Sequence, residues 1–443
     1  MSAGTFNPFN SQLRHALQTA PELVPSSGFR DFLFSSHSLG PTFTRFPIND
    51  IRVGSQQTPG EPGPITAAGR AINVDAWYPE HHAQHLAALQ GTDTITEIVA
   101  AAAYMHRLTP ATGTNSFTPR ALQMWRDDGL TAYLLGARPQ QAVFELSSPG
   151  ALKGSIQYTY EELSRFAAAI QSAGTSTDPQ VRGLPRREIA EAADGDLYVK
   201  LTNATPSPGV YDAQLQVKVG AASAYTSAPT INVFAATWTK LRYYNGSNAA
   251  DVGKSRSMPV LIYFADFTGA AIGDEWRIKA TEDVWAQSLP TRHVINETEC
   301  ELLKDGDVFQ FTGATITVTT PVFVPPNVGR RFKPGTKRSG RRTVQIQVSR
   351  EQNDVSVIRL LESGEPVDLR LHGYTGIELV AGNAATEVRT SFIMPDCRAE
   401  GELPGVPAAD RFEESVTLTA YPNADGTYPN DLTIETVVSQ ATL

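Results

Sequence analysis

Two short motifs resemble sites that bind phosphate or metal. The stretch NAADVGKS, residues 248–255, comes close to the phosphate-binding loop of nucleotide hydrolases, in which glycines let backbone N–H groups surround the phosphates. Asn248 stands where that loop needs its first glycine. The residues that follow contain Pro259 and are typical of a strand, whereas the mechanism needs a helix whose N-terminus faces the phosphate. We therefore interpret this stretch as a chance match.

The second motif, EHHAQH, places His81 and His85 four residues apart, on one face of a short helix, as in a zinc-binding helix. The metalloprotease form of this motif needs a glutamate after the first histidine, and His82 stands there. A ligand role is one interpretation of these histidines. The interpretation we favour is a solvent-exposed helix face.

Other signatures of catalysis are absent from the chain. It contains no G-x-S-x-G nucleophile motif and no C-x-x-C pair. The Asp-Gly-Asp triplets at 194 and 305 are typical of β-turns. We therefore expect a protein that is not an enzyme, with no catalytic residues, no cofactor and no metal site.

The start of the chain, its apolar runs and its cysteines indicate the compartment in which it is made. No signal peptide is recognisable at the start, and no apolar run reaches the length of a membrane helix. Cys300 and Cys397 are the only cysteines, too few for a disulfide framework or a zinc set. We expect both to be free thiols in a protein that is made and used in a reducing compartment.

One segment, the basic arm of residues 330–342, differs sharply in charge from the rest of the chain. It holds seven basic residues and no acidic one. These are Arg330, Arg331, Lys333, Lys337, Arg338, Arg341 and Arg342. Without them, 37 − 7 = 30 basic residues oppose 46 acidic ones, so the formal charge changes from −9 to −16. A protein that binds nucleic acid by charge more often carries a basic face across a whole domain.

Two interpretations of the basic arm remain. Runs of charge are often solvated loops. However, Pro334 and Gly335 suit an extended segment, and a basic extension on an acidic protein is well placed to meet an acidic patch on a second copy. Complementary patches of this kind set the orientation and register of a contact.

Strand patterns dominate the chain, so we predict a mainly β fold. Apolar and polar residues alternate over 70–76, 154–160, 314–320, 343–349, 414–421 and 431–438. Short helices are predicted at 79–91, 160–174, 187–194 and 353–364.

A weak internal repeat indicates how the chain is divided. Ile72 and Val344 lie in alternating strands, Leu89 and Leu361 lie in the helical segments that follow, and both pairs are 272 residues apart. Two unrelated strand–helix units would be the alternative explanation. We expect an N-terminal arm (1–29), a first copy (30–182), a linker (183–194), a small central β domain (195–293) and a second copy (294–443) whose loop spans 328–342.

Several segments together resemble the tail tube proteins of long-tailed, siphovirus-like bacteriophages. They are GRRTVQIQVSREQNDVSVIRLLESGEPVDLRL (340–371), EVRTSFIMPDCRAEG (387–401), the closing strands from residue 414, and 116–160 in the first copy. The resemblance implies a β-sandwich or barrel fold with a flanking helix, in which rings with six-fold symmetry stack into a tube. The long loops, here 53–69 and 328–340, would reach the next ring. A doubled chain would form a trimeric ring with pseudo-six-fold symmetry.

The resemblance also implies a function, a structural role in the virion tail. The chain would assemble in the bacterial host cytoplasm with further copies of itself and with the tape measure, terminator and distal tail proteins. Viral DNA would pass through without specific binding and no membrane would be involved, and an acidic body suits such a conduit because it repels phosphates weakly. The seven basic residues would contact the adjacent ring. The alternatives are a distal tail or baseplate ring protein of the same fold, and a nucleic-acid-binding protein that uses the basic arm.

Overall fold

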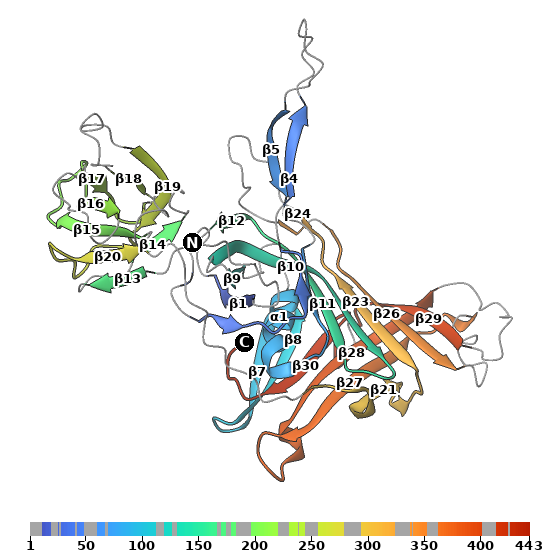
Figure 1. Cartoon of the computed structure of the whole chain (residues 1–443). Helices are drawn as coiled ribbons and strands as arrows, with labels where there is room; N and C mark the ends of the chain where they lie inside the picture. The colour runs from blue at the N-terminus through green and yellow to red at the C-terminus, as the bar shows by residue number, and fades with distance from the viewer. Residues whose placement is uncertain are drawn as a thin grey trace, which may run out of the picture.

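A computed structural model shows that the protein is mainly β, as predicted (Figure 1). The structure describes residues 11–18, 25, 28–39, 42–47, 60–66, 70–111, 119–125, 131–165, 170–173, 179–182, 196–219, 230–237, 239–243, 256–278, 294–323, 337–338, 340–351, 362–400, 413–423 and 426–443. In these ranges, no helix is long and apolar enough to cross a membrane.

The strands of the N-terminal half pair in a defined order. They are β1 (Gln12–Leu17), β2 (Arg30–Asp31), β3 (Ser36–His37), β4 (Thr42–Pro47), β5 (Gly60–Thr66), β6 (Arg70–Val74), β9 (Arg120–Trp125), β10 (Thr131–Ser147), β11 (Lys153–Thr159) and β12 (Glu162–Arg165). The pairs are β1–β2, β1–β9, β9–β10, β10–β11, β10–β12, β11–β6, β6–β3 and β4–β5. All are antiparallel.

The C-terminal half repeats this order. Its strands are β21 (Cys300–Lys304), β22 (Asp307–Val308), β23 (Gly313–Thr319), β24 (Val322–Phe323), β25 (Lys337–Arg338), β26 (Thr343–Glu351), β27 (Val367–Glu378), β28 (Glu387–Glu400), β29 (Glu413–Ala420) and β30 (Thr433–Val438). The pairs are β21–β22, β21–β27, β27–β28, β28–β29, β28–β30, β29–β26, β26–β23 and β24–β25. Each pair has its counterpart in the N-terminal half, and Ile72 and Val344 lie in the corresponding strands β6 and β26.

The two halves form one body, joined by two strand pairings. β10 pairs with β23, and β30 pairs with β8 (Ala103–Pro110), which forms a hairpin with β7 (Gly91–Val99). A single apolar core runs through both halves and includes Leu13, Phe144, Ile316, Phe392 and Ile434. The strands of residues 12–165 and 300–438 therefore share one strand network and one core, and β1 belongs to it although it lies in the expected N-terminal arm 1–29.

Strand β10 takes part in two sheets because it changes partners along its length. Its first residues pair with β9 and β12, and its later residues pair with β11 and β23. The register shifts between Leu134 and Ala137, where Gly136 has a φ of +66°. A Cβ atom at Gly136 would lie 2.7 Å from the Glu161 side chain, so glycine fits best at this irregularity of the strand.

The helix α1 (Pro79–Gln90) lies where the sequence predicted one. Pro79 fits the first turn, where an N–H has no partner within the helix, and Gly91 ends the helix in the left-handed conformation. Leu86 and Leu89 are fully buried, and the helix packs against β10, β8 and β30. Two single-turn 3-10 helices are also described, η3 (Glu297–Glu299) and η4 (Ala384–Thr386).

The helix predicted at 160–174 is wrong. Residues 162–165 form β12, and Ile170–Ala173 form β13. β12 pairs with β10, and β13 pairs with β20 (Glu275–Ile278), so backbone pairing outweighs the helical propensity of the Ala- and Leu-containing stretch. The predicted helix at 187–194 lies outside the described residues, as does 353–361 of the helix predicted at 353–364, of which residues 362–363 are described and helical.

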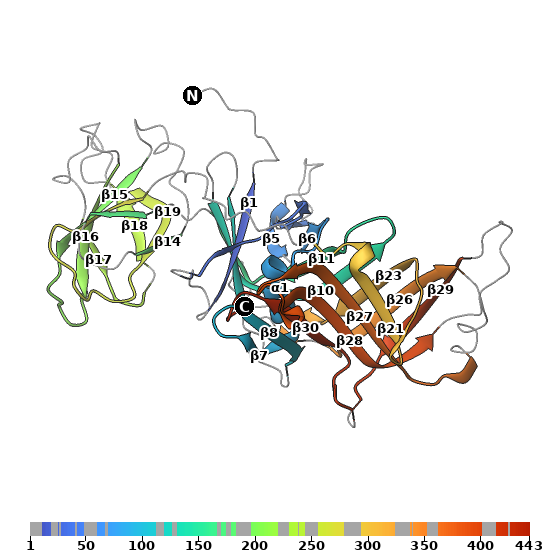
Figure 2. The same ribbon diagram turned by 90° about the horizontal axis from the view of Figure 1, so that it is seen from below.

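The central residues form a separate β unit with its own core (Figures 1 and 2). One sheet has the order β13, β20, β15 (Leu197–Asn203), β16 (Ala213–Val219) and β17 (Ile231–Val233). The other has the order β14 (Gln180–Arg182), β19 (Arg256–Tyr263) and β18 (Thr239–Tyr243). Because β13 and β14 belong to these sheets, the unit begins before residue 195.

Candidate assembly surfaces

The junction between β10 and β23 shows how one half of the chain docks onto the other. Residues 141–147 of β10 pair in register with residues 313–319 of β23. Phe144 lies opposite Ile316, and Ala142 lies opposite Val318; all four side chains are buried. The junction therefore combines a strand ladder with a continuous apolar face.

Strand β3, the counterpart of β23, has an open edge. β23 lies between β26 and β10, whereas β3 pairs with β6 on one side and with no other described strand. The Ser38 N–H donates to the Ala71 carbonyl of β6 at 2.8 Å. Because successive N–H groups of a strand point in opposite directions, the N–H of His37 points toward the open edge.

The basic arm is placed in part. Arg330, Arg331 and Lys333 lie outside the described residues, as do the side chains of Lys337 and Arg338. The backbone of Lys337 and Arg338 forms β25, which pairs with β24 and so closes the base of the arm. Arg341 is exposed.

Arg342 does not share the exposure expected of the arm. Its side chain is 5% exposed, and its Nε lies 3.3 Å from the Asp431 carboxylate. Its Nη1 donates to the side-chain oxygen of Gln90 on α1. Arg342 therefore links the base of the arm to the body of its own chain, and we leave it out of the inter-ring contact.

The histidines of α1 are core residues rather than a solvated face, which corrects the interpretation we favoured. His82 and His85 are fully buried, while His81 is half-buried. The Tyr78 N–H donates to Nδ1 of His82 at 3.0 Å, so the proton is on Nε2, which donates to the Leu33 carbonyl at 3.0 Å. These bonds replace water for an imidazole inside the protein.

The same cluster continues into β1, β9 and β11, which carry His15, Arg120 and Tyr158. Nδ1 of His85 lies 2.5 Å from the Tyr158 hydroxyl, and Arg120 donates to Nδ1 of His15 at 3.0 Å. Burial lowers the pKa of His82 to about 3 and also lowers the pKa of His15 and His85. Among the described residues, no group of three metal-ligating side chains converges.

The structure bears on two further motifs, the stretch that resembles a phosphate-binding loop and the Asp-Gly-Asp triplet at 305. Residues 248–255 lie outside the described residues, but the next eight form the strand β19, as predicted. Asp305 (φ 53°) and Gly306 (φ 88°) form the turn between β21 and β22, which confirms the turn interpretation of this Asp-Gly-Asp triplet.

The two cysteines are free thiols, as predicted. Burial, with the nearby Glu299 and Glu297, raises the pKa of Cys300 to about 12. Burial also raises the pKa of Cys397.

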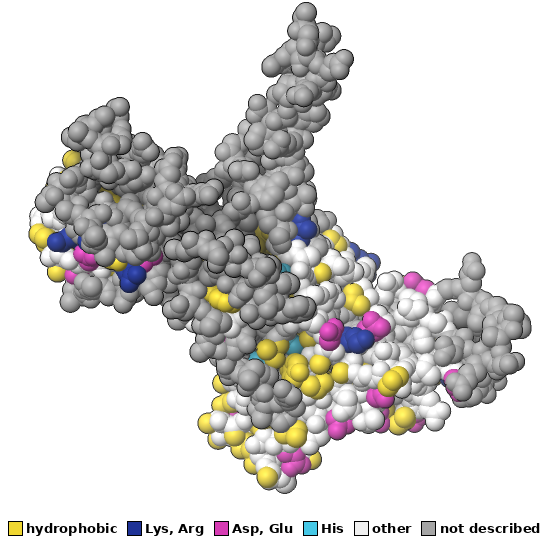
Figure 3. Space-filling model, viewed as in Figure 1, with side chains coloured by type: hydrophobic (Ala, Val, Ile, Leu, Met, Phe, Trp, Pro, Cys, Tyr) yellow, Lys and Arg dark blue, Asp and Glu magenta, His cyan; other side chains and the backbone are white. Residues whose placement is uncertain are grey.

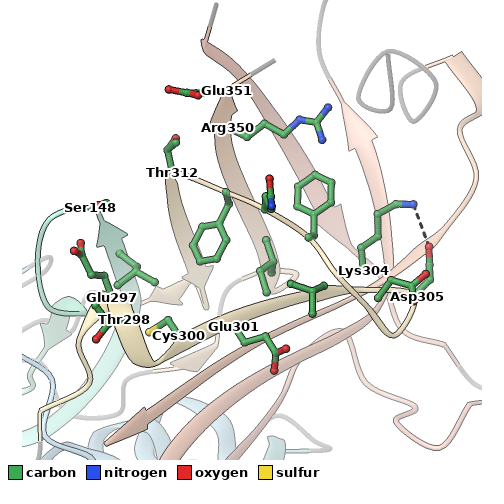
Figure 4. A pocket seen from close by; sticks show the side chains of 17 residues that line it. Ser148, Glu297, Thr298, Cys300, Glu301, Lys304, Asp305, Thr312, Arg350 and Glu351 are labelled. Atoms are coloured by element: carbon green, nitrogen blue, oxygen red, sulfur yellow. Dashed lines mark ion pairs between the residues drawn. The ribbon is translucent and has the colours of Figure 1, made fainter. Parts of the chain in front are cut away.

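A groove of about 1100 Å³ lies beside β21 and β22, and no sequence pattern indicated it (Figure 4). Its carboxylates are Glu297, Glu301, Asp305, Asp307 and Glu351. Phe309 and Phe311 also line it, and the Arg350 guanidinium lies 5.2 Å from the centre of the Phe309 ring. On the lower part of the face in Figure 3, acidic side chains are scattered among hydrophobic and uncharged ones.

No family model matches this chain, and a search of curated proteins finds no match.

Proposed function

We propose that this protein is the repeating unit of a ring that stacks into the tail tube of a long-tailed bacteriophage, as the resemblance of its sequence suggests. The observation that carries the proposal is the duplication. The two halves share one order of strand pairing, β23 of the second half docks onto β10 of the first, and the counterpart β3 has an open edge.

This arrangement favours a closed ring of identical chains. A contact between two different surfaces repeats from chain to chain, and it closes into a ring when the rotation between neighbours divides a full turn. If the open edge of β3 docks onto a neighbouring chain as β23 docks onto β10, the halves alternate around one axis. Three chains would then place six similar halves around a pore.

The charge of the protein suits a conduit for DNA. The formal net charge is −9, and it is −16 without the basic arm. An acidic wall repels phosphates weakly, so DNA would slide through without binding. In this role the ring would meet the tape measure, terminator and distal tail proteins in a virion tail assembled in the host cytoplasm.

Electron microscopy of the purified protein tests the proposal. We expect rings with a central pore that stack into tubes at high protein concentration. Single, unassembled particles under all conditions would contradict it. Rings that never stack, present in a few copies per virion, would favour the distal tail or baseplate alternative. Retention of DNA at physiological salt would favour nucleic-acid binding by the arm.

A further inference from the structure

The basic arm and the acidic groove lie at opposite ends of the same two strands. At one end Thr319 of β23 lies opposite Thr343 of β26, and the chain continues there into β24, β25 and the arm. At the other end Gly313 lies opposite Ser349, and the adjacent Thr312 and Arg350 line the groove. The molecule therefore has a basic end and an acidic end.

The groove is acidic and partly apolar. Five carboxylates and two basic side chains line it, so its formal charge is 2 − 5 = −3. Lys304 is paired with Asp305 at 3.3 Å, and Arg350 is buried over Phe309. Two phenylalanines and the 68% exposed Val308 add apolar surface next to these carboxylates. Such a surface suits a basic peptide that also carries an aromatic side chain.

The arm has this composition. Its segment RRFKPGTKR, residues 330–338, contains five basic residues, Phe332 and Pro334, and no acidic residue. Proline reduces the conformational freedom that a segment loses when it binds.

The arm cannot reach the groove of its own chain. The nine residues of β26 span about 26 Å, in eight steps of about 3.3 Å each. Thirteen residues, 324–336, connect β24 to β25, so the tip lies about seven residues from either base, at most about 24 Å away when fully extended. The arm base itself lies beyond the far end of β26, which increases the distance further.

We propose that the acidic groove between β21, β22 and the end of β26 binds the basic arm of a second copy of this chain, in a head-to-tail contact. A contact between unlike ends leaves a free arm and a free groove at the two ends of every assembly, so it repeats without limit. The inference rests on the proposed function, for which it supplies the stacking contact. Each exposed pair contributes little by itself, but the contact is repeated in every chain of a ring.

Charge reversal on each side, followed by their combination, tests the pairing. The groove variant is Glu301→Lys with Asp307→Lys, which changes the formal charge of the groove from −3 to −3 + 4 = +1. The arm variant is Arg330→Glu, Arg331→Glu, Lys337→Glu and Arg338→Glu, which changes residues 330–338 from +5 to 5 − 8 = −3. We expect each variant to form rings but to lower the fraction of protein in tubes at least ten-fold at about 150 mM salt, where charged contacts still act over about 8 Å. The combined variant should recover tubes, because both sides of the contact have changed sign.

A matched control places the same two substitutions outside the groove. Glu97→Lys with Glu378→Lys reverses two exposed carboxylates that do not line it, and should leave tube formation unchanged. If the groove variant does not fold, Glu301→Gln with Asp307→Asn removes the charge with little change in shape and should weaken stacking. A synthetic peptide of residues 328–340 should also block stacking of the wild-type protein, and a peptide with these residues in scrambled order should do so less well.

Three results would overturn the inference. One is a folded groove variant that forms tubes as well as the wild type does. Another is a combined variant that stacks no better than either single reversal, since the arm and the groove would then have different partners. The third is a peptide that does not compete. Failure of the wild-type protein to form rings would instead contradict the proposed function, so the two failures are distinguishable.

Discussion

The N- and C-terminal halves share one order of strand pairing but differ at both ends of their corresponding strands β6 and β26. At one end, the segment between β4 and β5 carries a single basic residue, Arg52, whereas the segment between β24 and β25 belongs to the basic arm. At the other end, α1 follows β6 and buries His82 and His85 against Phe32. The end of β26 instead borders the acidic groove.

This difference shows which parts of a duplicated fold are constrained. Strand pairing depends on the alternating buried positions, such as Ile72 in β6 and Val344, Ile346 and Val348 in β26. The segments beyond the strand ends are free to diverge. In this chain one copy enlarges the core at this end of its strand, and the other has an acidic groove there.

The largest effect is expected from proline in corresponding strands of the two halves. Thr317→Pro interrupts β23, which is paired on both sides, so it should lower the free energy of unfolding by about 3 kcal/mol or more. His37→Pro changes the open edge of β3 and should leave a folded chain that does not form rings. Chemical denaturation and size-exclusion chromatography check both. A folded His37→Pro protein that forms normal rings would show that β3 is not the ring contact.

The next largest effect on stability is expected from removing the ion-pair partner of Arg342, in comparison with truncating its exposed neighbour Arg341. Asp431→Asn leaves the buried Arg342 without its carboxylate partner and should cost about 3 kcal/mol of stability. Arg341→Ala changes an exposed side chain and should cost less than about 0.5 kcal/mol. Equal unfolding midpoints for the two variants would contradict this division of the arm.

Acid should destabilise the N-terminal half through its buried histidines. The pKa of His82 is about 3 in the folded chain and 6.5 in a model peptide, so the unfolded chain binds this proton first as the pH falls. The stability is therefore complete above pH 6.5 and decreases below it, by about 2 kcal/mol at pH 5.0 from His82 alone. His82→Gln should reduce the slope of unfolding free energy against pH in this range.

Hydrogen exchange can show which half of the molecule opens first in acid. At pH 5.0 we expect α1 and β1 to exchange before β26 and β29, because the buried histidines His15, His82 and His85 lie in these N-terminal elements. An unchanged pH slope in His82→Gln, or earlier exchange in β26, would contradict the assignment of acid sensitivity to this half.

The smallest effect is expected at the cysteines, which both lie in the C-terminal half. Burial and the neighbouring glutamates raise the pKa of Cys300 to about 12, so its thiol should react slowly with alkylating reagents at pH 8. Both thiols should react fully in denaturant. Because Cys300 lines the groove, its reaction should be slower in tubes than in isolated rings. Equal rates in tubes and rings would count against occupation of the groove by the arm.

Local patterns in the sequence indicated much of the fold. Alternation predicted the strands β23, β26, β29 and β30, the helix α1 lies where it was predicted, and the offset of 272 pairs Ile72 with Val344 in corresponding strands. Contacts between distant segments could not be read in this way. The pairings β10–β23 and β30–β8 depend on tertiary packing, and the same pairing turns residues 162–165 into a strand.

The candidate sites were less predictable for a related reason. Arg342 looks like its exposed neighbours in the sequence, and only the fold reveals Asp431 and Gln90 beside it. The buried His82 donates a hydrogen bond from Nε2 to the backbone carbonyl of Leu33, and sequence patterns do not show such a partner. The groove combines residues from β10, β21, β22 and β26, so it exists only after folding.

The number of chains in an isolated ring tests the central claim most directly. Native mass spectrometry of rings, with arm-reversed protein used to prevent stacking, should give three chains. Class averages from electron microscopy should then show six similar lobes around the pore. Rings of six chains, or a protein that remains monomeric at every concentration, would contradict the account, because the two halves would then not occupy equivalent positions around one axis.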